Sequence, residues 1–140
     1  MANNNISEAD KAKMFDYLKD YQDNIKTNFG NYNIADKKLH KFLSINDIYL
    51  GRLNQKCQGK ASKHQYYILY EQNKPKNKEN DEVHHLLRHL RNAIAHGRIR
   101  KRGSKIFQVS DKTSNGNSLT MTGEIDYKLF FDLIELAKNT

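Results

Sequence analysis

Apolar residues recur at helical spacing along most of the chain. Near the N-terminus they fall every three or four positions and share one face of a helix, at Met14, Leu18, Tyr21 and Ile25. Ser7 is a suitable N-cap for this helix, and Gly30 is a suitable end. We therefore predict a helix over residues 8–28, preceded by a polar lead over residues 1–6.

The middle of the chain is harder to assign from its apolar pattern. Residues 34–53 continue the helical spacing and predict one helical region, which a Ser-x-x-Asp sequence can kink. Residues 55–63 are polar and predict a loop or a frayed helix end. The tyrosine-rich run 64–71 has strand propensity, but it has no partner strand nearby, so we favour a short buried helix. Residues 74–80 predict a solvated loop.

The last third of the chain contains helical patterns and one change of period. Asn80 or Asp81 caps a helix that Gly97 ends. Its apolar face consists of Val83, Leu86, Leu87, Leu90, Ala93 and Ile94. Two short runs, 105–109 and 118–122, flank a loop that contains an Asn-Gly pair. This arrangement predicts a β-hairpin.

The order of these elements predicts a mainly α fold. Asp126 caps a last helix that continues to the C-terminus. Four to five helices then form a bundle, with the hairpin over residues 105–122 inserted before the last of them. With 140 residues, one Pro and seven Gly, the chain can bury a core and is too poor in turn residues for a β-sandwich. We expect a single domain over residues 1–140.

Charge and cysteine content narrow the functional classes. The formal net charge is +8, which suits either an anionic partner or simple solubility. Cys57 is the one cysteine, so an internal disulfide and a cysteine-rich zinc site are excluded. The N-terminus lacks the order of a signal peptide, and no run approaches the roughly 20 apolar residues that cross a bilayer. We expect a cytoplasmic protein that binds no membrane.

The helix before Gly97 carries an unusual set of polar residues. On a helical wheel, the side opposite the apolar face holds His85, Arg88, His89, Asn92 and His96. Arg91 lies at the boundary between the two sides. The cations that follow the helix at once are Arg98, Arg100, Lys101, Arg102 and Lys105.

Three interpretations of this polar side stay open. His85, His89 and His96 could bind a metal, although that needs further ligands from elsewhere in the chain. The polar side could instead be a structural or partner-facing surface, with His96 placed favourably at the negative end of the helix dipole. The third interpretation is chemistry on RNA. There an imidazole transfers protons at a ribose 2′-hydroxyl, an arginine holds the phosphate and an amide orients either group.

The RNA interpretation gives a role to most of these side chains and needs neither a cofactor nor a metal. Its candidate catalytic residues are Arg91, Asn92 and His96. Its candidate RNA- or phosphate-binding residues are Arg88, His89, Arg98, Arg100, Lys101 and Arg102. Elsewhere in the chain, Tyr66, Tyr67 and Tyr70 suit either base stacking or packing in the core and a dimer.

The motif helix also resembles a known family. The sequence Arg91-Asn92-Ala93-Ile94-Ala95-His96 is similar to the Arg-x4–6-His motif of the HEPN superfamily, whose members often have a polar residue directly after the arginine. The small size, the predominance of helices and the place of the motif late in a helix fit as well. The predicted hairpin is a departure from the family layout.

This resemblance implies a HEPN-like helical bundle that dimerises and brings two motif helices into one composite active site. It implies a metal-independent endoribonuclease that acts as a toxin or in defence against phage and plasmids. The 2′-hydroxyl would attack the phosphate and leave 2′,3′-cyclic phosphate and 5′-hydroxyl ends. His96 would be the acid–base, Arg91 the phosphate ligand and Asn92 the orienting group.

The same resemblance implies an alternative function and a further partner. Some members are non-catalytic modules that bind RNA, nucleotides or proteins. Others pair with an antitoxin protein that modifies a tyrosine beside the motif histidine. Because Ala95 occupies that position here, tyrosine modification is not available, whereas an antitoxin partner stays open.

Overall fold

A computed structural model describes residues 6–72 and 81–140. The predictions for residues 1–5, for the loop at 74–80 and for Asn80 as a helix cap lie outside these described residues. The helices are α1 (Glu8–Asp20), the π-helical turn η1 (Tyr21–Ile25), α2 (Lys37–Ile45), α3 (Gln55–Ala61), α4 (Glu82–Ala95) and α5 (Tyr127–Lys138). The strands are β1 (Ile48–Arg52), β2 (Tyr66–Tyr70), β3 (Ile99–Arg102), β4 (Ile106–Lys112) and β5 (Leu119–Asp126).

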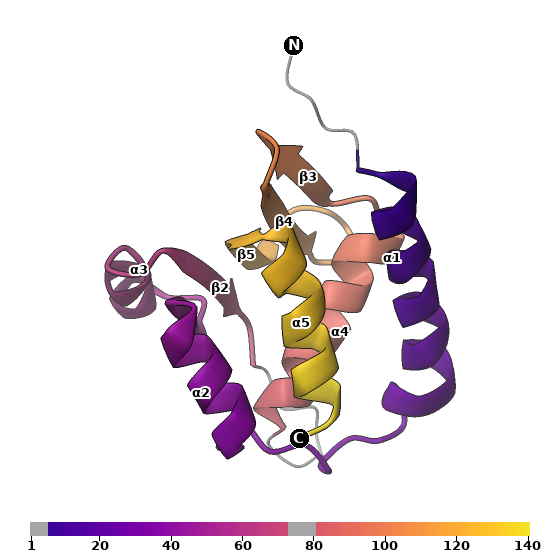
Figure 1. The fold of residues 1–140 in the computed structure, drawn as a ribbon, viewed down its shortest axis with the longest axis horizontal. Helices are drawn as coiled ribbons and strands as arrows, with labels where there is room; N and C mark the ends of the chain where they lie inside the picture. Colours follow the sequence, from indigo (N-terminus) through magenta and orange to yellow (C-terminus); the bar gives the residue numbers. More distant parts are fainter. Residues whose placement is uncertain (1–5, 73–80) are drawn as a thin grey trace.

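Within the described residues, the five strands form one mixed sheet in the order β1-β2-β5-β4-β3. β1 and β2 are parallel, and the other neighbours are antiparallel. The helices α2, α4 and α5 pack on the sheet, and α1 packs against α4 at the edge of the molecule (Figure 1). The short α3 contacts β1 and β2. The chain therefore has a helical layer on one face of a sheet.

The prediction of a mainly α bundle with one inserted hairpin is wrong. The structure is an α/β fold, because the predicted hairpin pairs as β4 and β5 but belongs to a five-stranded sheet. Residues 64–71, predicted as a short helix, contain β2, of which Ile68, Leu69 and Tyr70 are buried. One partner of β2 is the remote strand β5, so the local sequence carries no sign of the pairing.

A second correction concerns residues 34–53, predicted as one helical region. The helix α2 ends at Ile45 and the chain enters β1 at Ile48. Asp47 makes this break in the left-handed backbone region, with φ of 55°. Its carboxylate accepts hydrogen bonds from the backbone N–H of Gln65 (2.9 Å) and contacts Nδ1 of His64 (2.7 Å). Asp47 thus ties the start of β1 to the start of β2.

The connection between these two parallel strands is also helical. Residues 55–63, predicted as a loop or a frayed helix end, contain α3. Asn54 is its N-cap, and the side-chain oxygen of Asn54 accepts a hydrogen bond from the backbone N–H of Cys57 (2.8 Å). A short helix between parallel strands is the usual form of such a crossover.

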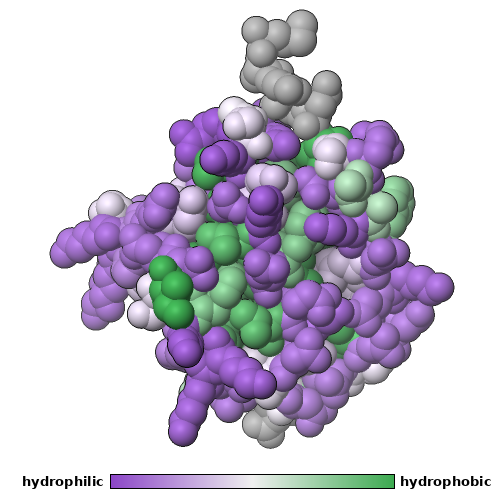
Figure 2. All heavy atoms as spheres, in the orientation of Figure 1, coloured by the Kyte–Doolittle hydropathy of each residue, from purple (hydrophilic) through white to green (hydrophobic). Residues whose placement is uncertain are grey.

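The hydrophobic core lies between the sheet and the helices. The predicted first helix, motif helix and last helix are confirmed, and their apolar sides meet in this core. The largest fully buried side chains are Tyr70, Phe107, Phe130, Leu39, Ile68, Leu69, Leu86, Leu87, Leu90, Met121, Ile125 and Leu133. Figure 2 shows a mostly hydrophilic surface on the helical side, with hydrophobic side chains gathered between α2 and α5. In the described part of the chain, no helix combines the length and apolarity needed to span a membrane.

Gly123 allows β2 and β5 to approach closely, and this gives a stability prediction. A Cβ atom at Gly123 would lie 2.6 Å from the backbone oxygen of Tyr67 and 2.9 Å from the side chain of Ile68. We expect Gly123→Ala to lower the free energy of unfolding by about 1–3 kcal/mol, because the strands must separate. Chemical denaturation measures this change.

The matched control is Gly59→Ala in α3, where a Cβ atom would meet nothing within 4 Å. Alanine has the higher helix propensity, so this variant is expected to gain about 0.5–1 kcal/mol. Equal stability of the two variants would contradict the close approach of β2 and β5.

Candidate functional site

The predicted motif lies on α4, whose position is fixed at both ends. Asp81 caps the helix, since its Oδ1 accepts a hydrogen bond from the backbone N–H of His84 (2.9 Å). Its Oδ2 accepts another from the backbone N–H of Gly30 (2.7 Å), which joins α4 to the chain after η1. At the other end, Gly97 has φ of 66°, as expected for a residue that ends a helix.

Much of the polar side of α4 is buried rather than exposed. His85 is 0% exposed and His89 is 2% exposed, and both belong to the side that the helical wheel separates from the apolar face. Arg88, Arg91 and Asn92 are half-buried, and His96 is exposed. On this side of α4, His89 and Asn92 contact Asp111 of β4, a strand that was predicted as part of a separate hairpin, and His85 contacts Phe29.

A buried carboxylate organises this side of the helix. Oδ2 of Asp111 lies 2.8 Å from Nδ1 of His89 and accepts a hydrogen bond from Nδ2 of Asn92 (3.2 Å). Oδ1 of Asn92 in turn accepts a hydrogen bond from Nη1 of Arg91 (3.0 Å). Two of the predicted catalytic residues, Arg91 and Asn92, are therefore held together, and Asp111 fixes the orientation of the amide.

Electrostatics favour the charged form of this carboxylate. Burial raises the pKa of Asp111, but the hydrogen bonds from His89 and Asn92 together lower it by more. The pKa of Asp111 therefore lies below the ordinary value of 3.8. The other ring nitrogen of His89, Nε2, lies 2.9 Å from the carbonyl oxygen of Glu71. Both ring nitrogens of His89 thus face an oxygen, and the side chain is held rigidly.

Asp111 is the residue that the sequence analysis missed. It was assigned to the loop between the two runs of the predicted hairpin, but it lies in β4. The signal that would have found it is the alternation of Phe107, Val109 and Asp111, which places all three on the same buried face of a strand. A carboxylate at such a position needs hydrogen-bond donors, and α4 supplies them.

His85 is a second buried histidine with a shifted pKa. Its Nδ1 lies 3.1 Å from Nη2 of Arg88, and its ring meets Phe29 edge-on at 5.4 Å. Within the described residues, its Nε2 has no hydrogen-bond partner. Burial, and then the positive charge of Arg88, lower the pKa of His85 to about 4. The neutral ring is the stable form in the folded protein.

This shift predicts how stability depends on pH. Between pH 6.5 and about 4, the unfolded chain takes up a proton at His85 and the folded chain does not. Stability contributed by His85 is therefore complete above pH 6.5 and falls as the pH drops, by up to about 1.4 kcal/mol per pH unit. Urea denaturation across this range should show that the free energy of unfolding falls less steeply with decreasing pH in His85→Asn than in the wild type. The same pH dependence in both proteins would contradict the lowered pKa of His85.

His96 lines a groove on the surface of the protein. It is the C-cap of α4, with φ of −98° and ψ of 9°, and its side chain is exposed. The groove has a volume of about 450 Å³ and runs from His96 over the surface of β2, β4 and β5. Arg98 and Arg100 line it together with Lys112. The third predicted catalytic residue thus lies next to a set of cations.

The structure separates the cations of the basic run. Arg98 and Arg100 line the groove, and Nη2 of Arg102 donates a hydrogen bond to Oε1 of Glu124 (2.7 Å), one of its lining residues. Lys101 points the other way, with Nζ 5.0 Å from the centre of the Tyr127 ring. Since successive residues of a strand face opposite sides of the sheet, β3 divides this run into two sets.

Arg91 and His96 point in different directions within one chain. Five residues along an α-helix correspond to about 7.5 Å along its axis and about 140° around it.

Beside His96, an apolar hollow of about 270 Å³ lies between α1 and α4. It is lined by Lys11, Met14, Phe15, Leu18, Ile94 and Ala95, and Phe15 is 71% exposed.

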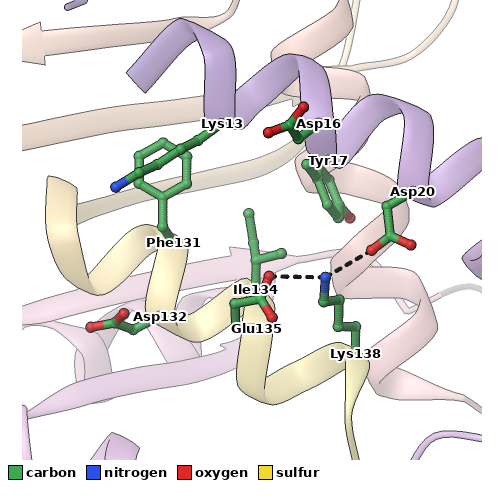
Figure 3. A pocket seen from close by; sticks show the side chains of 9 residues that line it. All are labelled: Lys13, Asp16, Tyr17, Asp20, Phe131, Asp132, Ile134, Glu135 and Lys138. Atoms are coloured by element: carbon green, nitrogen blue, oxygen red, sulfur yellow. Dashed lines mark hydrogen bonds and ion pairs between the residues drawn. The ribbon is translucent and has the colours of Figure 1, made fainter. Parts of the chain in front are cut away.

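Another hollow, of about 510 Å³, lies between α1 and α5 and contains none of the motif residues (Figure 3). Nζ of Lys138 reaches from α5 to Oδ2 of Asp20 on α1 (2.8 Å) and also contacts Oε1 of Glu135 (2.9 Å). Nζ of Lys13 lies 5.1 Å from the centre of the Phe131 ring. These contacts join α1 to α5 and so fix α1 beside the motif helix.

The histidines of α4 are not arranged as metal ligands in the described part of the chain. Within residues 6–72 and 81–140, no group of three or more His, Cys, Asp or Glu side chains is arranged to hold a metal ion. His85 and His89 instead have Arg88 beside both rings, and Nη2 of Arg88 lies 3.5 Å from Nε2 of His89.

Comparison with known proteins gives one match. A family model described as HEPN pEK499 p136 matches residues 13–138, which include α4, the Arg91–His96 motif and all the strands of the sheet. No curated protein and no solved structure matches the chain.

Proposed function

Since the chain belongs to the HEPN family, which indicates a nuclease-like or RNA-related module, we propose that it is a metal-independent endoribonuclease. The observation that carries the proposal is the position of His96, exposed where α4 ends and a groove lined by arginines begins. Arg91 and Asn92 lie earlier on the same helix, and Asp111 orients the amide of Asn92. An imidazole, a guanidinium and an oriented amide are the groups that such a reaction needs.

The proposed reaction is an intramolecular transfer at the RNA phosphate. His96 takes the proton of the ribose 2′-hydroxyl, the 2′-oxygen bonds to phosphorus and the bond from phosphorus to the 5′-oxygen breaks. The departing 5′-oxygen takes a proton from His96 of a second copy of the chain, so the products are a 2′,3′-cyclic phosphate and a 5′-hydroxyl. Arg91 stabilises the charge that builds on the other phosphate oxygens, and Asn92 positions the guanidinium of Arg91.

A second copy of the chain completes this site in our proposal. Two protons move in the reaction, and each chain supplies one exposed His96 at the end of α4. The apolar hollow beside it contains Phe15 of α1 and Ala95, the neighbour of His96. A twofold contact through this hollow would bury Phe15 and place the motif ends of both chains together.

Dimerisation has a direct test with a matched control. Phe15→Glu is expected to convert the dimer to a monomer and to abolish cleavage, because a buried carboxylate opposes the contact. Ile45 on α2 is exposed to the same extent, 70% against 71% for Phe15, so Ile45→Glu is expected to leave the dimer intact. Sedimentation velocity measures the association state of both variants. A wild-type monomer, or a dimeric Phe15→Glu, would contradict the composite site.

The experiment that tests the function is RNA cleavage in EDTA by the wild type, Arg91→Ala and His96→Ala. We expect cleavage by the wild type alone. Equal cleavage by all three would contradict the mechanism, and loss of wild-type cleavage in EDTA would indicate a metal-dependent nuclease. A folded dimer without any cleavage would favour the alternative, a non-catalytic module that binds RNA, a nucleotide or a protein.

We extend the proposal to a toxin or a defence component restrained by an antitoxin protein. An enzyme that cuts cellular RNA without a cofactor needs a partner or a trigger that limits it. Expression of the wild type is then expected to arrest growth, and His96→Ala is expected to relieve the arrest. Growth arrest by both proteins to the same degree would contradict this role.

A further inference from the structure

The face of the sheet that α2, α4 and α5 leave open carries an ordered row of polar side chains. Tyr67 on β2 lies opposite Glu124 on β5, Glu124 lies opposite Gln108 on β4, and Gln108 lies opposite Arg100 on β3. All four residues line the groove that begins at His96. The row spans three strand spacings, or roughly 14 Å.

A second row runs beside the first, closer to His96. Thr122 on β5 lies opposite Ser110 on β4, and the backbone N–H of Ser110 donates a hydrogen bond to the carbonyl oxygen of Arg98 (3.2 Å). These three residues line the groove as well, and Lys112 follows at the end of β4. The helices α2, α4 and α5 lie on the other face, so these side chains face outward, and α3 approaches this face beside Tyr67 and Thr122.

The charges in the groove suit an anionic chain. Arg98, Arg100 and Lys112 contribute three positive charges, and Glu124 is the one acidic residue among the described residues that line the groove. Its carboxylate is already compensated, since Oε1 accepts a hydrogen bond from Arg102 (2.7 Å) and Oε2 accepts one from Gln108 (3.1 Å). Phosphates can therefore bind the arginines without facing an unpaired carboxylate.

The far end of the first row suits a nucleobase. Tyr67 is half-buried, so its ring is held in place while part of it remains open to the groove. Burial, and then the charge of Glu124, raise the pKa of Tyr67, which keeps the ring neutral. A carboxylate oxygen has room for more than one hydrogen bond, so Glu124 can also accept one from the amino group of a base stacked on Tyr67.

We propose that the open face of the sheet binds single-stranded RNA and guides it to His96. Arg98, Arg100 and Lys112 hold the phosphates, and Tyr67 stacks against one base, whose amino group donates a hydrogen bond to Glu124. A duplex does not fit this surface, because its bases are already stacked and paired. The inference rests on the proposed function, since it supplies the path by which RNA reaches the catalytic histidine.

Charge removal on the two sides of β3 tests the phosphate contacts. Arg100→Gln and Lys101→Gln remove the same charge from neighbouring positions, but only Arg100 faces the groove. Both are made in a His96→Ala background, so that a labelled single-stranded RNA stays intact while its binding is measured over a series of salt concentrations. We expect weaker binding by Arg100→Gln, with a salt slope lower by about 0.7, and little change in Lys101→Gln. Equal binding by the two variants would overturn the proposal.

Tyr67 provides a test of base stacking. Tyr67→Leu is expected to weaken binding of single-stranded RNA by roughly tenfold, within the range measured for stacked bases. Tyr67→Phe keeps the ring and is expected to bind as the parent does. Equal loss in both variants, or equal affinity of the parent for duplex RNA, would overturn the base site.

Different results would contradict the proposed RNA surface and the proposed function. Absence of cleavage by the wild type, combined with selective loss of binding in Arg100→Gln, would overturn the function and leave the RNA surface. Normal cleavage, combined with equal binding by Arg100→Gln and Lys101→Gln, would overturn the surface and leave the function.

Discussion

Replacement of Asp111 by alanine is expected to lower the free energy of unfolding by about 3–5 kcal/mol. The side chain is buried, and it holds His89 at 2.8 Å and Asn92 at 3.2 Å. Without the carboxylate, the buried ring of His89 and the half-buried amide of Asn92 lose their shared acceptor. The loss is large because both groups belong to one network.

Urea denaturation of Asp111→Ala, with Asp132→Ala as the control, measures this effect. Asp132 is exposed on α5, and its removal is expected to change stability by less than about 0.5 kcal/mol. Asp111→Asn keeps one oxygen acceptor and serves if the alanine variant does not fold. A change below about 1 kcal/mol in Asp111→Ala would contradict the network.

The same carboxylate predicts a loss of stability in acid. The folded pKa of Asp111 lies below the ordinary value of 3.8, so its contribution is complete above that pH and is lost as the pH falls through the lower, folded value. This window lies below the one assigned to His85, which ends near pH 4. In Asp111→Asn, the loss of unfolding free energy below pH 4 should disappear, and the loss above pH 4 should remain.

The second large effect is expected at His96. His96→Ala is expected to lower kcat for RNA cleavage by about 10²–10⁴-fold, the range found when a general acid or base is removed. Because the side chain is exposed at the end of α4, stability should stay almost unchanged. Activity and stability therefore depend on different side chains around the motif helix: Asp111 of β4 supports the fold, and His96 at the end of α4 supports the reaction.

His40→Ala is the matched control for this prediction. His40 is also an exposed histidine on a helix, and it lies on α2, outside the groove that begins at His96. We expect the control to cleave RNA at the wild-type rate. A similar loss of kcat in both variants would show that the effect is not specific to the motif.

The sequence predicted the helices of the site better than the sheet around them. The motif helix has a cap, a helix-ending glycine and a strong apolar period, all of which are local signals. By contrast, β2 pairs with β1 across α3 and with β5 near the C-terminus, so its structure depends on contacts that no local pattern contains. Its tyrosine-rich run was assigned to a helix for that reason. The prediction for residues 34–53 was wrong for a similar reason: the sequence Ser44-x-x-Asp47 was interpreted as a kink in one helical region, whereas Asp47 separates α2 from β1.

The candidate site was predicted residue by residue but not as an arrangement. Arg91, Asn92 and His96 were placed on one helix, whereas their supporting residue, Asp111, was placed in a loop. The wheel also left His85 and His89 on an outward polar face, because it could not include their remote neighbours, Phe29 beside His85 and Asp111 of β4 beside His89. The division of the basic run between two faces of the sheet follows from β3, which was not predicted.

The most direct test of the central claim is cleavage of an end-labelled single-stranded RNA in EDTA, with identification of both new ends. The wild type is expected to give a 2′,3′-cyclic phosphate and a 5′-hydroxyl, and His96→Ala is expected to give neither. Cleavage by His96→Ala at the wild-type rate, or products with a 5′-phosphate, would contradict the account.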